Sequence, residues 1–223
     1  MSDRNLERAP FAPRLEEEEL DDATPAALAD AARHRHERWA GAGLSGQAAR
    51  DVELAQAELR RVDLDGARLH RLTLTDVRLI DCSLANLDAL GADLQRVTLE
   101  GCRMTGVALP EARLEDVAIT GCRADLANLR FARGRRVRLE DCSLAQADLS
   151  GADLRGARLV GCDLRGAELA GALLAGAVLD GCRLDGLRGA GGLRGARLRW
   201  ADVVELAGAF AAELGIELIE DET

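Results

Sequence analysis

Leucine recurs at every fifth position through most of the chain. The register from Leu54 to Leu184 has 27 positions without an insertion, and 22 of them hold leucine. Two residues before each of these centres lies Ala, Val, Leu or Cys, and the residue just before a centre is usually polar. This period fits neither a helix nor a plain strand, whose side-chain periods are 3.6 and 2.0 residues. It predicts a short straight face followed by a corner.

Four such faces close a square coil of twenty residues. Glycine at the fifth position, as in Gly151, Gly156 and Gly161, tolerates the backbone angles that a corner needs. Successive coils are expected to stack at the spacing of neighbouring strands, about 4.8 Å. The pattern therefore predicts an all-β solenoid of about seven coils, which form a rod roughly 34 Å long.

Cysteine follows the same register. The six cysteines are spaced by twenty residues, and each lies two positions before a centre: Cys82, Cys102, Cys122, Cys142, Cys162 and Cys182. They are predicted to form an inward-facing column in which each thiol packs as a small apolar group. A linear column does not offer the four converging ligands that zinc requires. Stacked side chains that point the same way also disfavour disulfides.

The repeats resemble those of the pentapeptide-repeat family, whose consensus is A-[DN]-L-x-x. The motif "ADL" at 92–94, 147–149 and 152–154 carries the likeness, which covers about residues 52–198. The resemblance implies a right-handed quadrilateral β-helix. Known members of the family bind DNA gyrase by mimicking duplex DNA, and some of them dimerise through their C-terminal segments.

The predicted organisation has three parts. Residues 1–50 form an N-terminal tail and a capping helix, residues 51–200 form the β-helix, and residues 201–223 form a C-terminal helix and an acidic tail. The N-terminal helix is expected over residues 25–40, because Thr24 is a candidate N-cap and proline follows it. Solenoids need such caps, since their ends expose apolar core and unpaired strand edges.

The C-terminal helix begins in "WADVVELAGAFAAELG". Asp202 is its candidate N-cap, with Glu205 three residues later, and Gly215 is its candidate stop. The helix is expected to cover the last coil or to share its apolar face with a second copy in a homodimer, and a short strand over residues 216–219 follows. The residues of this cap or dimer surface are Trp200, Val203, Leu206, Phe210 and Leu214.

Composition and charge narrow the possible functions. Aromatic residues make up 2% of the chain, so the core must be filled by small aliphatic side chains. The net charge is −10, yet residues 51–200 carry 22 acids and 22 arginines, which leaves the acidity in the tails. The charged N-terminus and the lack of a long apolar run predict a cytoplasmic protein without a membrane partner.

One coil is rich in arginine. Its candidate partner-binding residues are Arg130, Phe131, Arg133, Arg135, Arg136 and Arg138. The twenty-residue offset predicts that Arg135 meets Glu115, that Arg136 meets Asp116 and that Arg133 meets Asp153. The cluster is therefore either a patch that binds a partner or a set of internal ion pairs.

No set of residues suggests catalysis, a metal or a cofactor. The chain has three histidines, and its glycines mark corners rather than a phosphate-binding loop. We expect a non-catalytic scaffold that binds a protein, with a DNA-mimicking modulator of a type II topoisomerase as the alternative. Such a modulator would give resistance to quinolones or to a natural topoisomerase poison. Direct binding to nucleic acid is not expected, because it relies on basic groups that neutralise phosphates.

Overall fold

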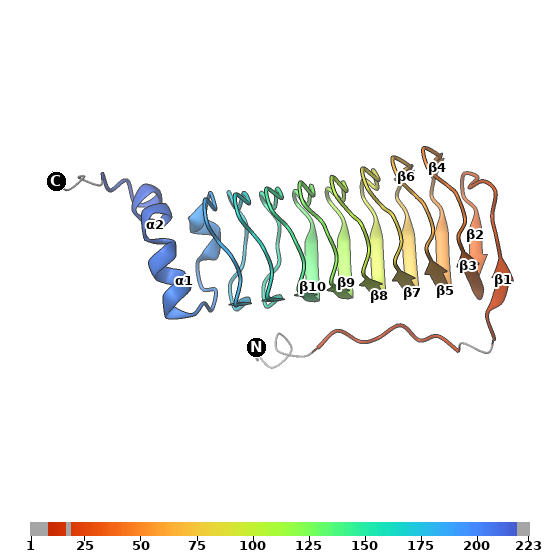
Figure 1. Ribbon diagram of the computed structural model, residues 1–223, viewed down its shortest axis with the longest axis horizontal. Coiled ribbons are helices and arrows are strands. Elements are labelled where there is room, and N and C mark those ends of the chain that lie inside the picture. Colours follow the sequence, from red (N-terminus) through yellow and green to blue (C-terminus); the bar gives the residue numbers. More distant parts are fainter. Residues whose placement is uncertain (1–8, 17–18, 218–223) are drawn as a thin grey trace.

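Parallel strands stacked along one axis make up the body of the molecule (Figure 1). The computed structural model describes residues 9–16 and 19–217. The strands are β1 (Asp21–Ala23), β2 (Arg33–Arg35), β3 (Glu37–Ala40), β4 (Ala48–Arg50), β5 (Glu53–Arg60), β6 (Arg68–His70), β7 (Thr73–Ile80), β8 (Asp93–Glu100), β9 (Arg113–Thr120), β10 (Arg133–Glu140), β11 (Arg158–Val160) and β12 (Val178–Asp180). Near the C-terminus lie the 3-10 helix η3 (Ala190–Leu193) and the helices α1 (Trp200–Glu205) and α2 (Ala207–Glu213).

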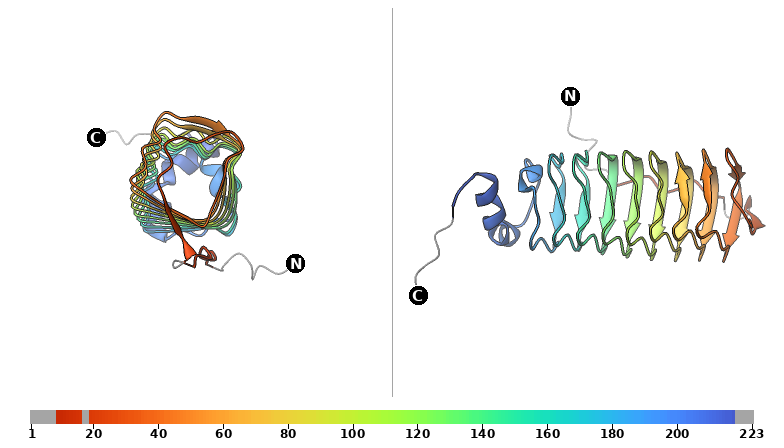
Figure 2. Two further views of the ribbon diagram at one scale, coloured as in Figure 1. Left: turned by 90° about the vertical axis from the view of Figure 1, so that its right-hand side faces the viewer. Right: turned by 90° about the horizontal axis from the view of Figure 1, so that it is seen from above.

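The strands pair in the twenty-residue register that the sequence predicts. Val97 in β8 lies beside Val117 in β9, which in turn lies beside Val137 in β10. The main sheet has ten strands, and β4 pairs with β6 in a second sheet. The chain winds through about 8 turns with a four-sided cross-section, one more than the predicted seven (Figure 2).

The leucine centres and the small residues before them fill the interior. Leu69 is 2% exposed and Ala67, two positions earlier, is fully buried. The same alternation holds in successive coils, so leucines stack on leucines and alanines or cysteines stack on one another. The core is therefore a continuous column of similar aliphatic layers, which explains how the fold forms with so few aromatic residues.

Corners place a residue in the left-handed region of φ. Gly161 has φ of 64°, and a Cβ atom at this position would lie 2.4 Å from the Oδ1 atom of Asp141, the corner residue one coil earlier. Asp141 itself has φ of 50°. Asp, Asn and Gly are the residues that adopt this conformation most readily, so the turn chemistry agrees with the repeat pattern.

The predicted N-terminal helix over residues 25–40 is wrong. Residues 33–40 instead form β2 and β3, which pair with β5 at the twenty-residue offset. His34 lies beside Leu54 and Trp39 lies beside Leu59, so both occupy centre positions of an additional coil. These residues pair with β5 instead of forming a helix, because the open strand edge of the solenoid must be covered.

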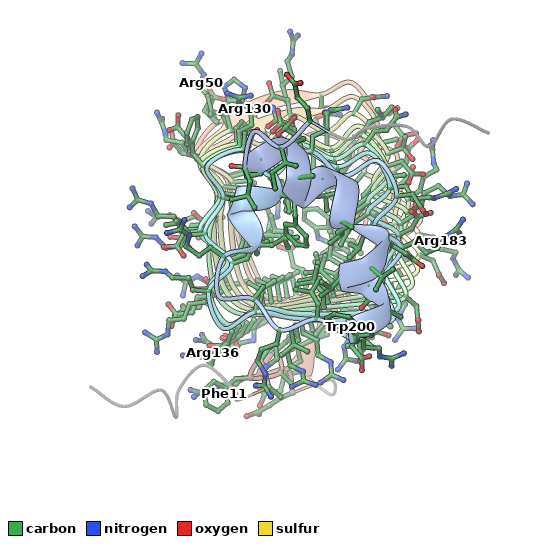
Figure 3. The ribbon with its side chains drawn as sticks, turned by 90° about the vertical axis from the view of Figure 1, so that its left-hand side faces the viewer. Phe11, Arg50, Arg130, Arg136, Arg183 and Trp200 are labelled. Atoms are coloured by element: carbon green, nitrogen blue, oxygen red, sulfur yellow. The ribbon has the colours of Figure 1, made fainter. Side chains whose placement is uncertain are left out.

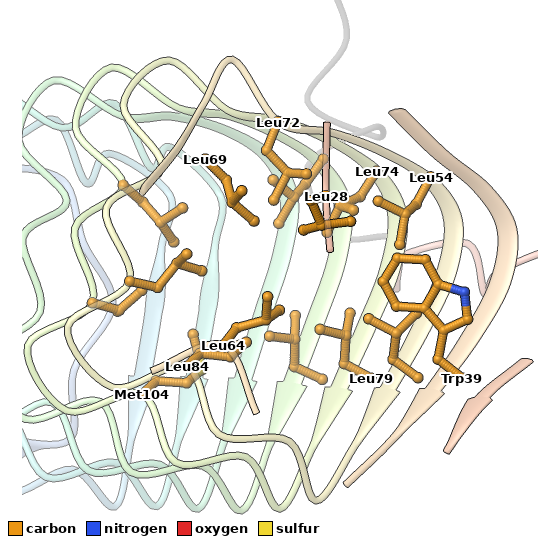
Figure 4. A pocket seen from close by; sticks show the side chains of 16 residues that line it. Leu28, Trp39, Leu54, Leu64, Leu69, Leu72, Leu74, Leu79, Leu84 and Met104 are labelled. Atoms are coloured by element: carbon orange, nitrogen blue, oxygen red, sulfur yellow. The ribbon is translucent and has the colours of Figure 1, made fainter. Parts of the chain in front are cut away.

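Trp39 and the segment before β2 close the N-terminal end of the core. The Trp39 side chain is buried, and its Nε1 atom donates a hydrogen bond of 2.6 Å to Oε2 of Glu37. His34 packs edge-on against the indole, with ring centroids 4.9 Å apart. Leu28 covers the remaining opening and is held through its backbone N, which donates to Oε1 of Gln47 at 2.8 Å. Figure 4 shows Trp39 and Leu28 at the end of an apolar cavity of about 40 Å³ that runs along the core.

The C-terminal helix is present but differs from the prediction in three respects. It is interrupted at Leu206, which separates α1 from α2. Arg199, not Asp202, is the N-cap, and Asp202 accepts a hydrogen bond of 3.2 Å from the Arg199 backbone. Trp200 does not cover the last coil, because it is 79% exposed. Gly215 ends the helix with φ of 69°, as predicted. Of the short strand expected over residues 216–219, residues 216 and 217 are not in a strand, and residues 218 and 219 lie outside the described part of the chain.

Candidate functional site

The six cysteines form the predicted buried column. All six are free thiols, and each Sγ atom donates to backbone carbonyls, as Cys162 does to Leu139 at 3.6 Å and to Val160 at 3.5 Å. Hydrogen bonds between successive thiols raise the pKa of Cys102 and Cys162 and lower that of Cys82, Cys142 and Cys182. All six thiols are buried and bonded to backbone carbonyls in the same way, so we assign the column to packing.

Replacing Cys162 with alanine should leave the fold intact. The substitution removes one sulfur atom from a tightly packed position, so we expect the free energy of unfolding to fall by about 1 kcal/mol. Urea denaturation followed by circular dichroism measures this change. A variant that fails to fold would contradict the assignment of the column to packing.

The arginine-rich coil is not one patch. Arg136 forms two hydrogen bonds to Asp116, of 2.5 and 2.6 Å, and Arg135 lies 3.6 Å from Glu115. These are the predicted pairs. The predicted pair of Arg133 and Asp153 is replaced by an ion pair of 2.6 Å between Asp153 and Arg155. Arg138 pairs with Glu140 in its own strand.

Arg130 and Phe131 lie apart from the other arginines. Figure 3 shows Arg130 at the top of the coil, whereas Arg136 lies beside Phe11 at the bottom. The Arg130 guanidinium lies 5.5 Å from the centroid of the Phe131 ring and 3.0 Å from Asp148. Phe131 is 53% exposed. The six candidate residues therefore divide into an Arg130–Phe131 pair, the set Arg135, Arg136 and Arg138 that pairs with neighbouring carboxylates, and Arg133, whose predicted ion pair does not form.

Phe131 borders a shallow hollow that extends over the equivalent corners of the next two coils. Its ring lies over Gly151, where a Cβ atom would come within 2.5 Å of two ring carbons. Gly171 extends the hollow by one more coil. Ion pairs between Arg130 and Asp148 and between Arg188 and Glu168, each 3.0 Å long, border the hollow. An exposed aromatic ring beside charged pairs is the kind of surface that anchors a protein partner.

A second surface, which sequence analysis missed, lies at another corner of the coil. Asp76, Arg96, Asp116 and Arg136 occupy this corner in four successive coils, and we call them the Asp–Arg column. Arg96 binds Asp76 with hydrogen bonds of 2.6 and 2.7 Å, as Arg136 binds Asp116. The side chains of Asp76 and Asp116 are 9% and 4% exposed. The N-terminal segment, residues 9–16, runs along this corner under the solenoid (Figure 1).

The carboxylates of the Asp–Arg column stay ionised despite their burial. Burial alone would raise the pKa of Asp116, but hydrogen bonds from Arg136 and from the Phe11 backbone lower it below the usual range. Asp76 has a lowered pKa for the same reason, with Arg96 and the Arg14 backbone as donors. The only sequence signals for this surface were the alternation of Asp and Arg every twenty residues and the two prolines of "APFAPR".

Glu58 is the centre of another cluster of buried ion pairs. Its side chain is 2% exposed and lies 2.6 Å from Arg60 and 3.4 Å from both Arg38 and Arg78. Arg38 and Arg78 belong to the coils before and after that of Glu58. The hydrogen bond from Arg60 is the largest cause of the lowered pKa of Glu58. This cluster ties three coils together and is structural.

The predicted cap or dimer residues fall into two groups. Leu206 belongs to the apolar core and Phe210 packs against it, so these two residues attach the helices to the solenoid end, and Val203 is half-buried. Trp200 and Leu214 are 79% and 74% exposed. Homodimerisation through these residues stays a prediction.

Family matches cover the middle of the solenoid. Residues 92–169 match the family described as "Pentapeptide repeat region", and residues 73–109 match "Pentapeptide repeats (8 copies)". The chain is a pentapeptide-repeat protein. No curated protein sequence shows significant similarity to it.

Solved structures similar to this pentapeptide-repeat protein include those of HetL and QnrB1. HetL, a pentapeptide repeat protein involved in heterocyst differentiation regulation from the cyanobacterium Nostoc sp. strain PCC 7120, shares 25% identity with a TM-score of 0.33 over 75% of this chain and 87% of its own. Full-length QnrB1, a plasmid-mediated fluoroquinolone resistance protein, shares 17% identity with a TM-score of 0.31 over 88% of this chain and 100% of its own. These scores do not identify a partner.

Two kinds of feature are absent from the described part of this pentapeptide-repeat protein. Residues 9–16 and 19–217 contain no group of three or more His, Cys, Asp or Glu residues arranged to hold a metal ion. Within the same residues, no helix has the length and apolar character needed to cross a membrane.

Proposed function

We propose that this pentapeptide-repeat protein is a non-catalytic scaffold that binds a protein partner through the corner around Phe131. The observation that carries the proposal is the Phe131 ring, 53% exposed, at the edge of a hollow whose neighbouring corners are glycines. Aromatic rings in such positions supply much of the binding energy of protein interfaces. The ion pairs beside the hollow would give the interface its polar rim.

The alternative, a DNA mimic that acts on a type II topoisomerase, has less support. A DNA mimic needs ordered negative charge along its faces, whereas the repeats have as many arginines as acids. Many of these charges neutralise each other at short distance, as Asp163 does with Arg165 and Glu168 with Arg188. In a supercoiling assay with purified DNA gyrase, we therefore expect no inhibition at low micromolar protein. Inhibition would favour the alternative.

Affinity capture with the full-length chain tests the Phe131 surface. A tagged chain is used as bait in a lysate of the source organism, and the bound proteins are quantified by mass spectrometry. Phe131→Ser should lower the recovery of the specific partner by about tenfold or more, as expected for an aromatic anchor. The measurement compares the same partner across all baits.

Leu126→Ser is the matched control. Leu126 is 55% exposed and also occupies a left-handed corner, with φ of 60° against 57° for Phe131. The two substitutions therefore remove similar exposed apolar groups at equivalent backbone positions. Equal recovery with both variants, or no partner retained by the unmodified bait, would contradict the proposal.

A further inference from the structure

The N-terminal segment meets the Asp–Arg column through its backbone. The Phe11 backbone N donates to Oδ1 of Asp116 at 3.1 Å, and the Arg14 backbone N donates to Oδ1 of Asp76 at 2.9 Å. Both donors directly follow prolines, Pro10 and Pro13. Proline lacks an N–H group and favours the extended polyproline conformation. Each N–H donor therefore follows a residue that has no N–H group of its own.

The spacing of the donors matches the spacing of the acceptors. Phe11 and Arg14 are three residues apart, which is one turn of a polyproline helix, with a rise of about 9.3 Å. The N–H groups of these two residues therefore lie on the same side of the helix. Asp76 and Asp116 are two coils apart, which is about 9.6 Å at the usual strand spacing. An extended peptide thus presents one N–H group to every second coil, where the column holds a carboxylate.

The arginines between the acids complete the surface. Arg96 and Arg136 each bind one Asp with two hydrogen bonds, which fixes the carboxylate and leaves an oxygen lone pair for the peptide N–H. The Phe11 ring lies 5.3 Å from the Arg136 guanidinium, a cation–π distance. The column therefore recognises backbone donors in a fixed register and one aromatic side chain.

We propose that the Asp–Arg column is a binding site for proline-rich extended peptides and that residues 10–14 occupy it in cis. Its external ligand would be a segment of another protein with the pattern proline, aromatic, any residue, proline, any residue. The chain's own segment competes for the site, so such a partner binds when that segment is displaced. This surface is separate from the Phe131 corner and does not depend on the function proposed there.

A full-length variant with an open site provides the test. Phe11→Pro combined with Arg14→Pro removes both N–H donors and the aromatic ring but preserves an extended backbone. The probe is a fluorescein-labelled synthetic peptide with the sequence of residues 9–16, and binding is measured by fluorescence anisotropy. The double variant should bind the peptide saturably, and the unmodified chain should bind it at least about tenfold more weakly, because its own segment competes with the peptide.

Three controls make the result decisive. Asp116→Asn in the double variant should weaken binding by about tenfold or more, because a hydrogen bond to a charged acceptor is lost. Asp51→Asn, at a different corner where Asp51 pairs with Arg71, should not change it. A peptide with proline at both donor positions should not bind. If the double variant does not fold, Phe11→Pro alone takes its place.

Two results would overturn the proposal. The first is absence of peptide binding by the folded open variant at millimolar peptide. The second is equal affinity with and without Asp116→Asn, or for the peptide whose donors are removed.

Discussion

Replacing Trp39 with alanine should lower the free energy of unfolding by about 3–5 kcal/mol. Trp39 is 1% exposed and closes the N-terminal end of the core, where it stacks above Leu59 and lines the central cavity. Removing the indole would open the column of leucines to water at its end. It would also leave Glu37 without its hydrogen bond from Nε1. Urea denaturation monitored by circular dichroism measures the loss.

Trp200→Ala is the matched control for this prediction. Trp200 is the other tryptophan of the chain and is 79% exposed at the start of α1. Its truncation removes the same number of atoms but creates no cavity, so the free energy of unfolding should change by about 0.5 kcal/mol or less. Equal effects of the two substitutions would show that the Trp39 side chain does not close the N-terminal end of the core.

Replacing Glu58 with glutamine should lower the free energy of unfolding at neutral pH by about 2–3 kcal/mol. The substitution keeps the shape of the side chain but removes the charge that Arg38, Arg60 and Arg78 share. The carboxylate is 2% exposed, so water screens it little, whereas the arginines are partly exposed and can regain some hydration. Chemical denaturation at neutral pH measures the difference.

The effect of Glu58→Gln should depend on pH in a defined direction. The pKa of Glu58 is lowered in the folded state, mainly by Arg60. Its contribution is therefore complete above the pKa of the unfolded chain, about 4.3, and is lost as the pH falls through the lower folded value. The difference in stability between the two proteins should shrink below about pH 4. A difference that stays constant across this range would rule out the carboxylate charge as its cause.

Glu53→Gln is the control for Glu58→Gln. Glu53 also pairs with an arginine, Arg33, at 3.2 Å, but the two side chains are 39% and 70% exposed. Exposed pairs of this kind contribute about 0–1 kcal/mol. A loss as large as that of Glu58→Gln would mean that burial does not explain the difference between the two sites.

The repeat pattern predicted the solenoid but not its ends. Between Leu54 and Leu184, each coil repeats the same layer, so the local period is enough to place core and corner. His34 and Trp39 continue this register one coil upstream, with an imidazole and an indole at the centres instead of leucine. The sequence around them also has helix-start signals, and these led to the wrong prediction. The need to pair the open edge of the solenoid decided in favour of strands.

The ion pairs of the arginine-rich coil were predictable only in part. The twenty-residue offset gave the pairs of Arg135 with Glu115 and of Arg136 with Asp116, because the coil geometry alone brings these residues together. Asp153 instead pairs with Arg155, two residues along the same strip of chain. Spacing does not reveal which of two nearby arginines a carboxylate selects, since that choice depends on side-chain geometry.

The sequence by itself determined the coil, its corners, the buried cysteine column and the C-terminal helix. Each of these follows from a period or a capping signal that acts over a few residues or one turn of the solenoid. Only the tertiary structure decided that the N-terminal segment lies on the Asp–Arg column. The hydrogen bonds that hold it join residues 105 and 62 positions apart. They use backbone N–H groups, which every residue except proline carries, so the residue types alone do not identify them.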